Sequence, residues 1–163
     1  MTFDDLLREH GPTLWRVVAG YTPPGAERDD LAQDVLVAVW LALPRFRREG
    51  SVRSFVLRIA HNRGLSHTWR RAKRSPPEVE PKDVADPRPG ADEQVATNER
   101  TEQFLRHLRT LPLGQREVLA LALEGLPHAE IAEIVGITRE NVTVRLSRAR
   151  EALRRSIEKE EAA

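Results

Sequence analysis

The segment TRENVTVRLSRAREALRR, residues 138–155, carries six arginines and two acids and contains neither glycine nor proline. On a helix, four apolar side chains fall on one narrow stripe between the arginines: Val142, Leu146, Ala149 and Leu153. Guanidinium groups in this arrangement suit phosphate oxygens, but many ordinary solvated helices carry a similar charged face. The residues that precede the segment decide between these two interpretations.

The preceding residues, LPHAEIAEIVGI, have the spacing of a helix-turn-helix. Ile131 and Ala132 supply the inner face of a short helix, and Gly136 supplies a turn with positive φ. Thr138 is placed to cap the next helix, and Val142 to pack back against the first one. In this motif the second helix enters the major groove of DNA. An ordinary αα-hairpin is the alternative, but the arginine-rich second helix favours DNA binding.

Two groups of side chains on this second helix are therefore candidate DNA contacts. Those at its N-terminal end or exposed side are candidates for reading bases, namely Thr138, Arg139, Glu140, Asn141 and Thr143. The candidates for phosphate contacts are Arg145, Arg148 and Arg150, with Arg154 as a further candidate.

A second basic block covers residues 45–74, with ten basic residues and one acid. The flanking residues are acidic: 1–44 hold seven acids and three basic residues, and 75–103 hold eight acids and three basic residues. The net charge of +1 for the whole chain conceals this alternation. Separate basic blocks in an otherwise acidic chain are typical of a protein that contacts nucleic acid at two places.

Composition excludes several classes of protein. The 163 residues include no cysteine, so a disulfide framework and a cysteine-based zinc site are excluded. No apolar run approaches 18 residues, and the N-terminus MTFDDLLREH is acidic and amphipathic. We therefore expect a cytoplasmic protein without a signal peptide and without membrane insertion.

Periodicity predicts an all-α fold of two small helical domains joined by a flexible linker. We expect helices at about 2–19, 26–43, 51–74, 92–109, 113–123, 129–135 and 138–158. The core stripe of the second helix is Leu31, Val35, Val39 and Leu43, and that of the third is Val52, Phe55, Ile59 and Asn62. Five prolines and a mostly acidic charge identify residues 75–96 as a linker. The predicted domains are a three-to-four-helix bundle at 1–74 and a helix-turn-helix domain at 97–158.

Two long segments together resemble a known family. DDLAQDVLVAVWLALPRFRREGSVRSFVLRIAHNRGLSHTWRRAKR, residues 29–74, resembles region 2 of the extracytoplasmic-function (ECF) subfamily of sigma-70 type RNA polymerase sigma factors. LPLGQREVLALALEGLPHAEIAEIVGITRENVTVRLSRAREALRR, residues 111–155, is similar to their region 4. The resemblance implies an alternative sigma factor that binds core RNA polymerase and directs promoter-specific transcription initiation. The implied partners are the β′ clamp helices, the β flap, promoter DNA and an anti-sigma factor, and no cofactor is implied.

The resemblance also assigns roles to individual residues. The implied core polymerase contacts are Asp30, Leu31, Gln33, Asp34 and Val37. The implied contacts to the −10 element are Arg47, Arg48, Ser51, Arg53, Asn62, Arg63, Arg70 and Arg71. The −35 element would be read as duplex by the arginine-rich helix, through the base and phosphate candidates named above. Two positions depart from the family pattern: Ser66 replaces a frequent acid, and Thr143 replaces a frequent lysine.

The sequence also bears on other functions. The five histidines form no metal-ligand pair with acids on one face, and no glycine-rich phosphate loop or paired-carboxylate motif is present, so we do not expect an enzyme. Surface or capping roles are expected for these histidines. Trp69 is expected to pack on its domain, with base stacking as the alternative, and Trp15 and Trp40 to face the core or a partner. A stand-alone dimeric helix-turn-helix transcription regulator is the main alternative function, and a sigma-like decoy is another.

Overall fold

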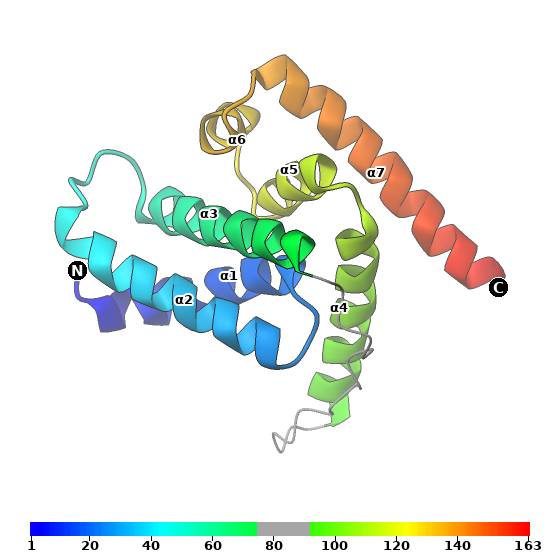
Figure 1. The fold of residues 1–163 in the computed structure, drawn as a ribbon, viewed down its shortest axis with the longest axis horizontal. Coiled ribbons are helices and arrows are strands. Elements are labelled where there is room, and N and C mark those ends of the chain that lie inside the picture. The colour runs from blue at the N-terminus through cyan, green and yellow to red at the C-terminus, as the bar shows by residue number, and fades with distance from the viewer. Residues whose placement is uncertain (75–91) are drawn as a thin grey trace. The chain divides into compact units, whose positions relative to one another are not determined.

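The structure is a computed structural model that describes residues 1–74 and 92–163. In these ranges it contains seven α-helices and one short 3-10 helix and no strand, which confirms the predicted all-α fold. The chain divides into two compact units, of which one holds α1 to α3 and the other α4 to α7 (Figure 1). Residues 75–91 of the predicted linker lie outside the described residues, and the chain is helical from Asp92.

The first unit packs three helices against one another: α1 (Phe3–Tyr21), α2 (Ala26–Ala42) and α3 (Val52–Lys73). A 3-10 helix, η1 (Leu43–Arg45), follows α2, which ends one residue before the predicted end at 43. Thr2 caps α1, and its side chain accepts a hydrogen bond from the Asp5 N–H at 3.1 Å. The Asp5 carboxylate accepts in return from the Thr2 N–H, so both bonds of a capping box are present.

The predicted stripe of α2 forms part of the core of this unit. Leu31, Val35 and Val39 are at most 2% exposed, whereas Leu43 lies in η1 and is half-buried. A side chain every four residues returns to nearly the same face of a helix, which explains why this stripe could be predicted. The core partners from α1 include Leu6 and Val18.

The predicted stripe of α3 is wrong. The buried residues of this helix are Val56, Leu57, Ala60, His61 and Gly64, and Asn62 is exposed. The cause is Tyr21 at the end of α1: its hydroxyl is hydrogen bonded to Nδ1 of His61 at 2.8 Å. A Cβ atom added to Gly64 would lie 2.5 Å from Cδ2 of the Tyr21 ring. Gly64 is therefore a point of close approach between α1 and α3.

The second unit contains α4 (Asp92–Thr110), α5 (Leu113–Leu123), α6 (His128–Val135) and α7 (Arg139–Ala162), and α7 contacts the other three. Its core includes Leu121, Ile131, Val142 and Leu146, which are all at most 1% exposed. The predicted bounds of α5 agree with the structure, and α7 runs four residues beyond the predicted end at 158. Val142 and Leu146 confirm the apolar stripe of the arginine-rich segment.

The C-terminal half of α7 is attached to α4 by polar side chains. Arg106 donates a hydrogen bond to Glu160 at 2.8 Å, and Nδ1 of His107 lies 2.7 Å from the Ser156 hydroxyl. The other ring nitrogen of His107 contacts Glu160 as well. His107 is 9% exposed, so this histidine, like His61, departs from the surface role expected for it. The last turns of α7 are thus part of the folded unit.

Candidate nucleic-acid and partner interfaces

The helix-turn-helix predicted in the second unit is present as α6 and α7. Gly136 has φ 80°, in the left-handed region, and its N–H donates to the Ala132 carbonyl at 2.8 Å. The Thr138 side chain accepts from the Asn141 N–H at 3.1 Å and caps α7. Ile131 and Val142 are completely buried between the two helices, whose packing is fixed by this turn.

The candidate base-reading residues lie in the first turns of α7, except Thr138, which is the cap residue just before it. The exposed members are Thr138, Arg139, Glu140, Asn141 and Thr143. The hydroxyl of Thr143 lies 3.2 Å from Nδ1 of His128, the first residue of α6, so both helices of the motif contribute to this surface. The sequence pattern contained no signal for this contact.

The arginines of α7 divide into two kinds. Arg148 and Arg150 are exposed, as a phosphate contact requires. Arg145 instead points inward, with Nη1 3.2 Å from the Glu117 carboxylate and 3.5 Å from the Gly114 carbonyl of α5. Burial raises the pKa of Glu117, and the Arg145 charge opposes that rise. The structure therefore places Arg145 in the α5–α7 contact rather than on the open face predicted for it.

Arg154 is also engaged within α7. It forms ion pairs with Glu151 at 2.6 Å and with Glu158 at 2.9 Å, on the exposed side of the helix. Hydrogen bonds from Arg154 hold the pKa of the Glu151 carboxyl below its usual range. The open cationic surface of α7 is therefore centred on Arg148 and Arg150.

In the first unit, a loop between η1 and α3 carries the first of the predicted −10 contacts. Arg47, Arg48 and Ser51 are all exposed, as is Arg53 in the first turn of α3. The loop is shaped by positive φ angles of 56° at Arg48 and 95° at Gly50, of which the first is uncommon for a residue with a side chain. Phe46 anchors it, because its ring lies 4.6 Å from the ring of Phe55 on α3.

Ser51 ends the loop and caps α3. Its hydroxyl oxygen accepts from the Ser54 N–H at 3.0 Å, as the prediction of a helix start at Ser51 requires. The same hydroxyl donates to the Ser54 side chain at 3.0 Å. Any role of Ser51 in holding DNA would have to compete with these two hydrogen bonds.

The predicted −10 contacts on α3 are exposed, but three of the arginines already have acidic partners on α2. Arg63 and Arg70 both approach Asp34, at 3.6 and 4.0 Å, and Arg71 lies 3.1 Å from Glu27. Asp34 was predicted as a polymerase contact, so one carboxylate connects both predicted surfaces. Exposed ion pairs of this kind contribute only about 0–1 kcal/mol and exchange readily with other charges. Asn62, in contrast, has its side chain on the open face.

The predicted polymerase-binding residues of α2 do not all lie on its surface. Asp30 and Gln33 are exposed and Val37 is 50% exposed, so these side chains are open to a partner. Leu31 is 2% exposed and belongs to the core of the unit. This is a correction to the predicted site, because a side chain in the core cannot touch a partner unless the unit opens.

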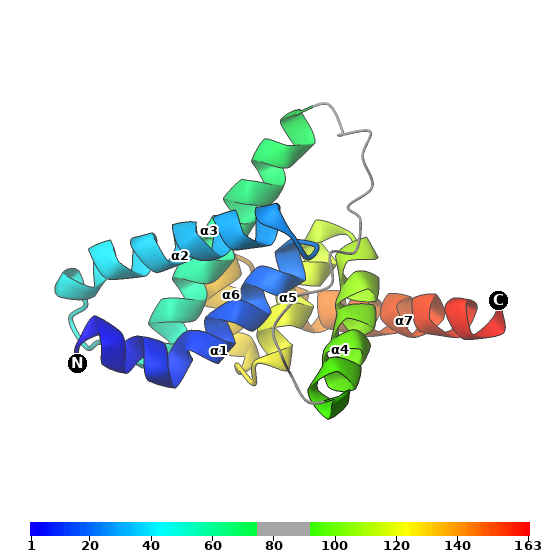
Figure 2. The same cartoon turned by 90° about the horizontal axis from the view of Figure 1, so that it is seen from below.

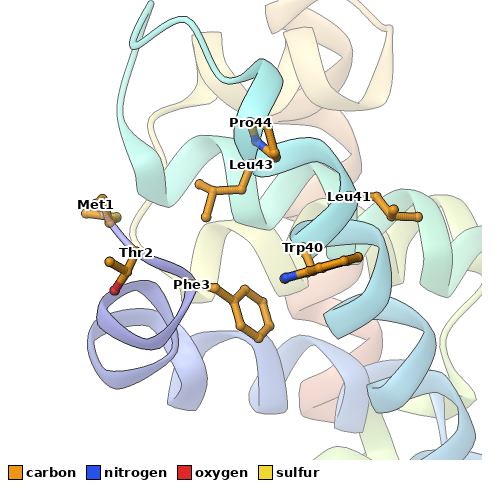
Figure 3. Close-up of a pocket in the computed structure, with 7 residues that line it drawn as sticks. All are labelled: Met1, Thr2, Phe3, Trp40, Leu41, Leu43 and Pro44. Atoms are coloured by element: carbon orange, nitrogen blue, oxygen red, sulfur yellow. The ribbon is translucent and has the colours of Figure 1, made fainter.

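An apolar surface at the end of α2 extends beyond the prediction. Trp40 is 59% and Leu41 is 60% exposed, next to Val37 along the helix. Trp40 was expected in the core or at a partner, whereas nothing in the sequence pattern singled out Leu41. A hollow beside them is lined by Met1, Thr2, Phe3, Trp40, Leu41, Leu43 and Pro44. Figure 3 shows that the Phe3 and Trp40 rings project into the space between the start of α1 and the end of α2.

Two further observations limit the kinds of site on this chain. Among the side chains that the structure describes, those of residues 1–74 and 99–163, no group of three or more histidine or acidic side chains is arranged to hold a metal ion. Among the described helices, none combines the length and the apolar composition needed to cross a bilayer. The surfaces that stand out are cationic and apolar ones.

Comparison with known proteins defines the class of these two units. The family model for sigma-70 region 2 matches residues 6–75, and the model for sigma-70 region 4 matches residues 101–153. The chain is 32% identical over 154 residues to the ECF RNA polymerase sigma factor SigM of Mycobacterium tuberculosis, covering 94% of this chain and 76% of the relative. It is 30% identical over 160 residues to the RNA polymerase sigma factor CnrH of Cupriavidus metallidurans, covering 93% and 84%.

Two solved structures are also similar to this chain. CnrH in complex with the cytosolic domain of CnrY superposes with a TM-score of 0.69 at 25% identity, covering 96% of this chain and 88% of that one. The sigma factor RpoE, in complex with the anti-sigma factor NepR from Bartonella quintana, shares the fold with a TM-score of 0.74 at 21% identity, covering 96% of both chains.

The two units, one with a basic loop and helix and one with a helix-turn-helix, define a two-domain transcription initiation factor. The chain belongs to the ECF subfamily of the sigma-70 family, as its sequence had suggested. It is thus an alternative sigma factor, a protein that directs transcription initiation.

Proposed function

We propose that this sigma factor binds core RNA polymerase through α2 of its first unit. The proposal rests on the separation of two kinds of surface on that unit, one apolar with acidic neighbours and the other cationic. One part of α2 presents Asp30, Gln33 and the apolar residues Val37, Trp40 and Leu41, whereas the following loop and α3 present exposed cations. An exposed apolar patch with acidic neighbours suits a protein partner and not a phosphate backbone. The β′ clamp helices are the proposed partner.

The −10 element is the proposed ligand of the basic loop and α3. Arg47 and Arg48 stand on a loop whose unusual backbone angles hold it in a defined shape, and Asn62 offers an amide on the adjacent open face. Arg53, Arg63, Arg70 and Arg71 would follow the phosphates. Three of these arginines are paired with Asp34 or Glu27 of α2. DNA phosphates would either replace these carboxylates or share the arginines with them.

The −35 element is the proposed ligand of α7, read as duplex DNA. Residues 138–143 occupy the N-terminal part of a helix that a helix-turn-helix places in the major groove. Arg148 and Arg150 lie further along the helix, where phosphate contacts fix its position. Arg145 would act indirectly, by holding α7 against α5 through Glu117.

The remaining parts of the proposal concern setting and regulation. The protein would work in the cytoplasm, where core polymerase and promoter DNA are found, without membrane insertion, and it would leave catalysis to the polymerase. Its relatives CnrH and RpoE have been solved with CnrY and with the anti-sigma factor NepR, respectively. We extend this to the present chain and propose an anti-sigma factor that covers the apolar surface of α2.

Run-off transcription with purified bacterial core polymerase tests the proposal. The template is the DNA upstream of the gene for this protein, and the expected result is a defined transcript that depends on the protein. The double variant Arg47→Ala/Arg48→Ala and the variant Asn62→Ala should lose most of this transcript. Arg8→Ala, which removes an 81% exposed arginine side chain from α1, is the matched control and should transcribe like the wild type.

The alternative function, a stand-alone dimeric helix-turn-helix regulator, predicts the opposite results. Such a protein would shift duplex DNA without polymerase and would give no transcript with it on any of several templates. That pair of results would contradict the proposed function. A protein that binds core polymerase and never initiates would instead be the sigma-like decoy.

A further inference from the structure

Trp69 lies on the surface of α3 with 60% of its area exposed, although we expected it to pack on its domain. Its position on the helix explains why. At 100° per residue, Trp69 lies about 180° from Ala60 and about 140° from Gly64, which both face the core of the unit. Trp69 therefore points away from α1 and α2, and a large amphipathic ring on such a face suits a ligand.

The part of α3 that carries Trp69 extends past the end of α1. Tyr21, the last residue of α1, packs on Gly64, and nine residues of α3 follow that contact. Residues 69–74 are all exposed. Figure 2 shows these last turns of α3 continuing away from α1. Several sides of this segment are thus accessible to a long ligand.

Four other exposed side chains share the face of Trp69. Within about 60° of it around the helix are Arg58, Asn62, Ser66 and Lys73. This stripe contains two cations, two short polar groups and one aromatic ring. It is about 22 Å long, the length of about six stacked bases at 3.4 Å each.

The acids of α2 contact α3 on another side. Arg63, Arg70 and Arg71, which pair with Asp34 or Glu27, lie 100° or more from Trp69 around the helix. The stripe of Trp69 consequently keeps its two positive charges on a face separate from these acids. Cations that follow a phosphate backbone, combined with an aromatic ring between them, are the combination by which proteins hold single-stranded nucleic acid.

We infer that Trp69 stacks on an unpaired base of the promoter DNA, and that the stripe Arg58–Asn62–Ser66–Trp69–Lys73 continues the strand path beyond the basic loop. The inference rests on the proposed function, because it needs a promoter strand held at the loop and at Asn62. It adds Arg58, Ser66 and Lys73, which the sequence did not assign to DNA, and it chooses base stacking, the alternative role, for Trp69. A protein partner on this face is the competing occupant, which the two cations disfavour.

The test uses holoenzyme assembled from core polymerase and full-length protein. The probe is the promoter used for run-off transcription, prepared with an unpaired −10 segment and, in a second series, with one base at a time removed from the non-template strand. Trp69→Ala should weaken binding roughly 5- to 150-fold, the range expected for loss of one stacked base. Trp69→Phe should keep most of the affinity because it keeps a ring. Trp15→Ala, which removes a 44% exposed tryptophan from α1, is the matched control and should bind like the wild type.

The base-removal series identifies stacking specifically. At one position, removal of the base should weaken wild-type holoenzyme by a similar factor but have no further effect on Trp69→Ala holoenzyme. Equal binding by the two proteins, or independent losses at every position, would overturn the inference. Weaker binding of Trp69→Ala to core polymerase would also overturn the inference, because this face of α3 would then contact polymerase and not DNA. The proposed function itself fails only if wild-type holoenzyme does not transcribe.

Discussion

At the scale of single residues, the contact between Tyr21 and His61 determines which face of α3 is buried in the first unit. Tyr21 and His61 are 40 positions apart in the sequence and share a buried hydrogen bond of 2.8 Å. His61 is 2% exposed, and burial lowers its pKa to about 4. This side chain is therefore neutral in the folded protein at neutral pH.

The first prediction concerns the pH dependence of stability. The unfolded chain binds a proton at His61 near pH 6.5, whereas the folded chain does so only near pH 4. Stability from this residue is therefore full above about pH 6.5 and decreases as the pH falls through the window from 6.5 to 4. The free energy of unfolding should decrease by up to about 3 kcal/mol across this window.

Urea denaturation of wild type and His61→Gln between pH 7 and pH 5 measures this effect. The variant lacks the titrating group, so its stability should change much less with pH over that interval. The comparison stays above pH 5 because carboxylates begin to titrate below it. Parallel pH profiles for the two proteins would show that His61 does not carry the dependence.

At the scale of helices, the crossing of α1 and α3 depends on a missing side chain. The Tyr21 ring occupies the space where any residue other than glycine at position 64 would place its Cβ atom. A helix can tolerate glycine at a cost of about 1 kcal/mol when close packing requires it. In this protein, the close approach of α1 and α3 requires glycine at position 64.

The second prediction is that Gly64→Ala destabilises the protein by about 1–3 kcal/mol, because the added methyl group overpacks the crossing. Thermal unfolding followed by circular dichroism measures the change. Gly11→Ala in α1 is the matched control, since no atom beyond the adjoining backbone of its own helix lies within 4 Å of the Cβ position there. The control should raise stability slightly through helix propensity. Equal effects of both substitutions would refute the packing explanation.

The helices themselves could largely be predicted from the sequence, whereas the faces of α3 and the partners of its charges could not. Thr2, Ser51 and Thr138 mark helix starts because a cap acts within three residues. The buried face of α3 depends instead on Tyr21, and the inward turn of Arg145 depends on Glu117, which is 28 positions away. Periodicity describes one helix at a time and contains no information about such distant partners.

At the scale of the whole molecule, the two units present separate cationic surfaces that can be altered independently. The open phosphate candidates of the second unit are Arg148 and Arg150, and those of the first are on the loop before α3. The division into two domains and the two basic blocks could be predicted from composition. The apolar surface around Leu41 could not, because an exposed leucine gives the same sequence signal as a buried one.

The third prediction is that Arg148→Ala/Arg150→Ala reduces the salt dependence of holoenzyme binding to duplex promoter DNA. Loss of two phosphate contacts should lower the slope of log K against log salt concentration by about 2. Arg154→Ala is the matched control on the same helix, because two carboxylates hold its charge at 2.6 and 2.9 Å, closer than the single acids beside Arg63, Arg70 and Arg71. Binding titrations at four salt concentrations would give the slopes. An unchanged slope for the double variant would show that other residues make the phosphate contacts to duplex DNA.

The attachment of α7 to α4 gives that helix the mechanics of a lever. It is one continuous helix of 24 residues, about 36 Å long, whose first turns carry the proposed reading residues and whose last turns are held by Arg106 and His107. A tilt of about 5° at the held end would displace the other end by about 3 Å, the length of a hydrogen bond. Side chains far from any base thereby share with the Arg145–Glu117 contact the placing of the reading end.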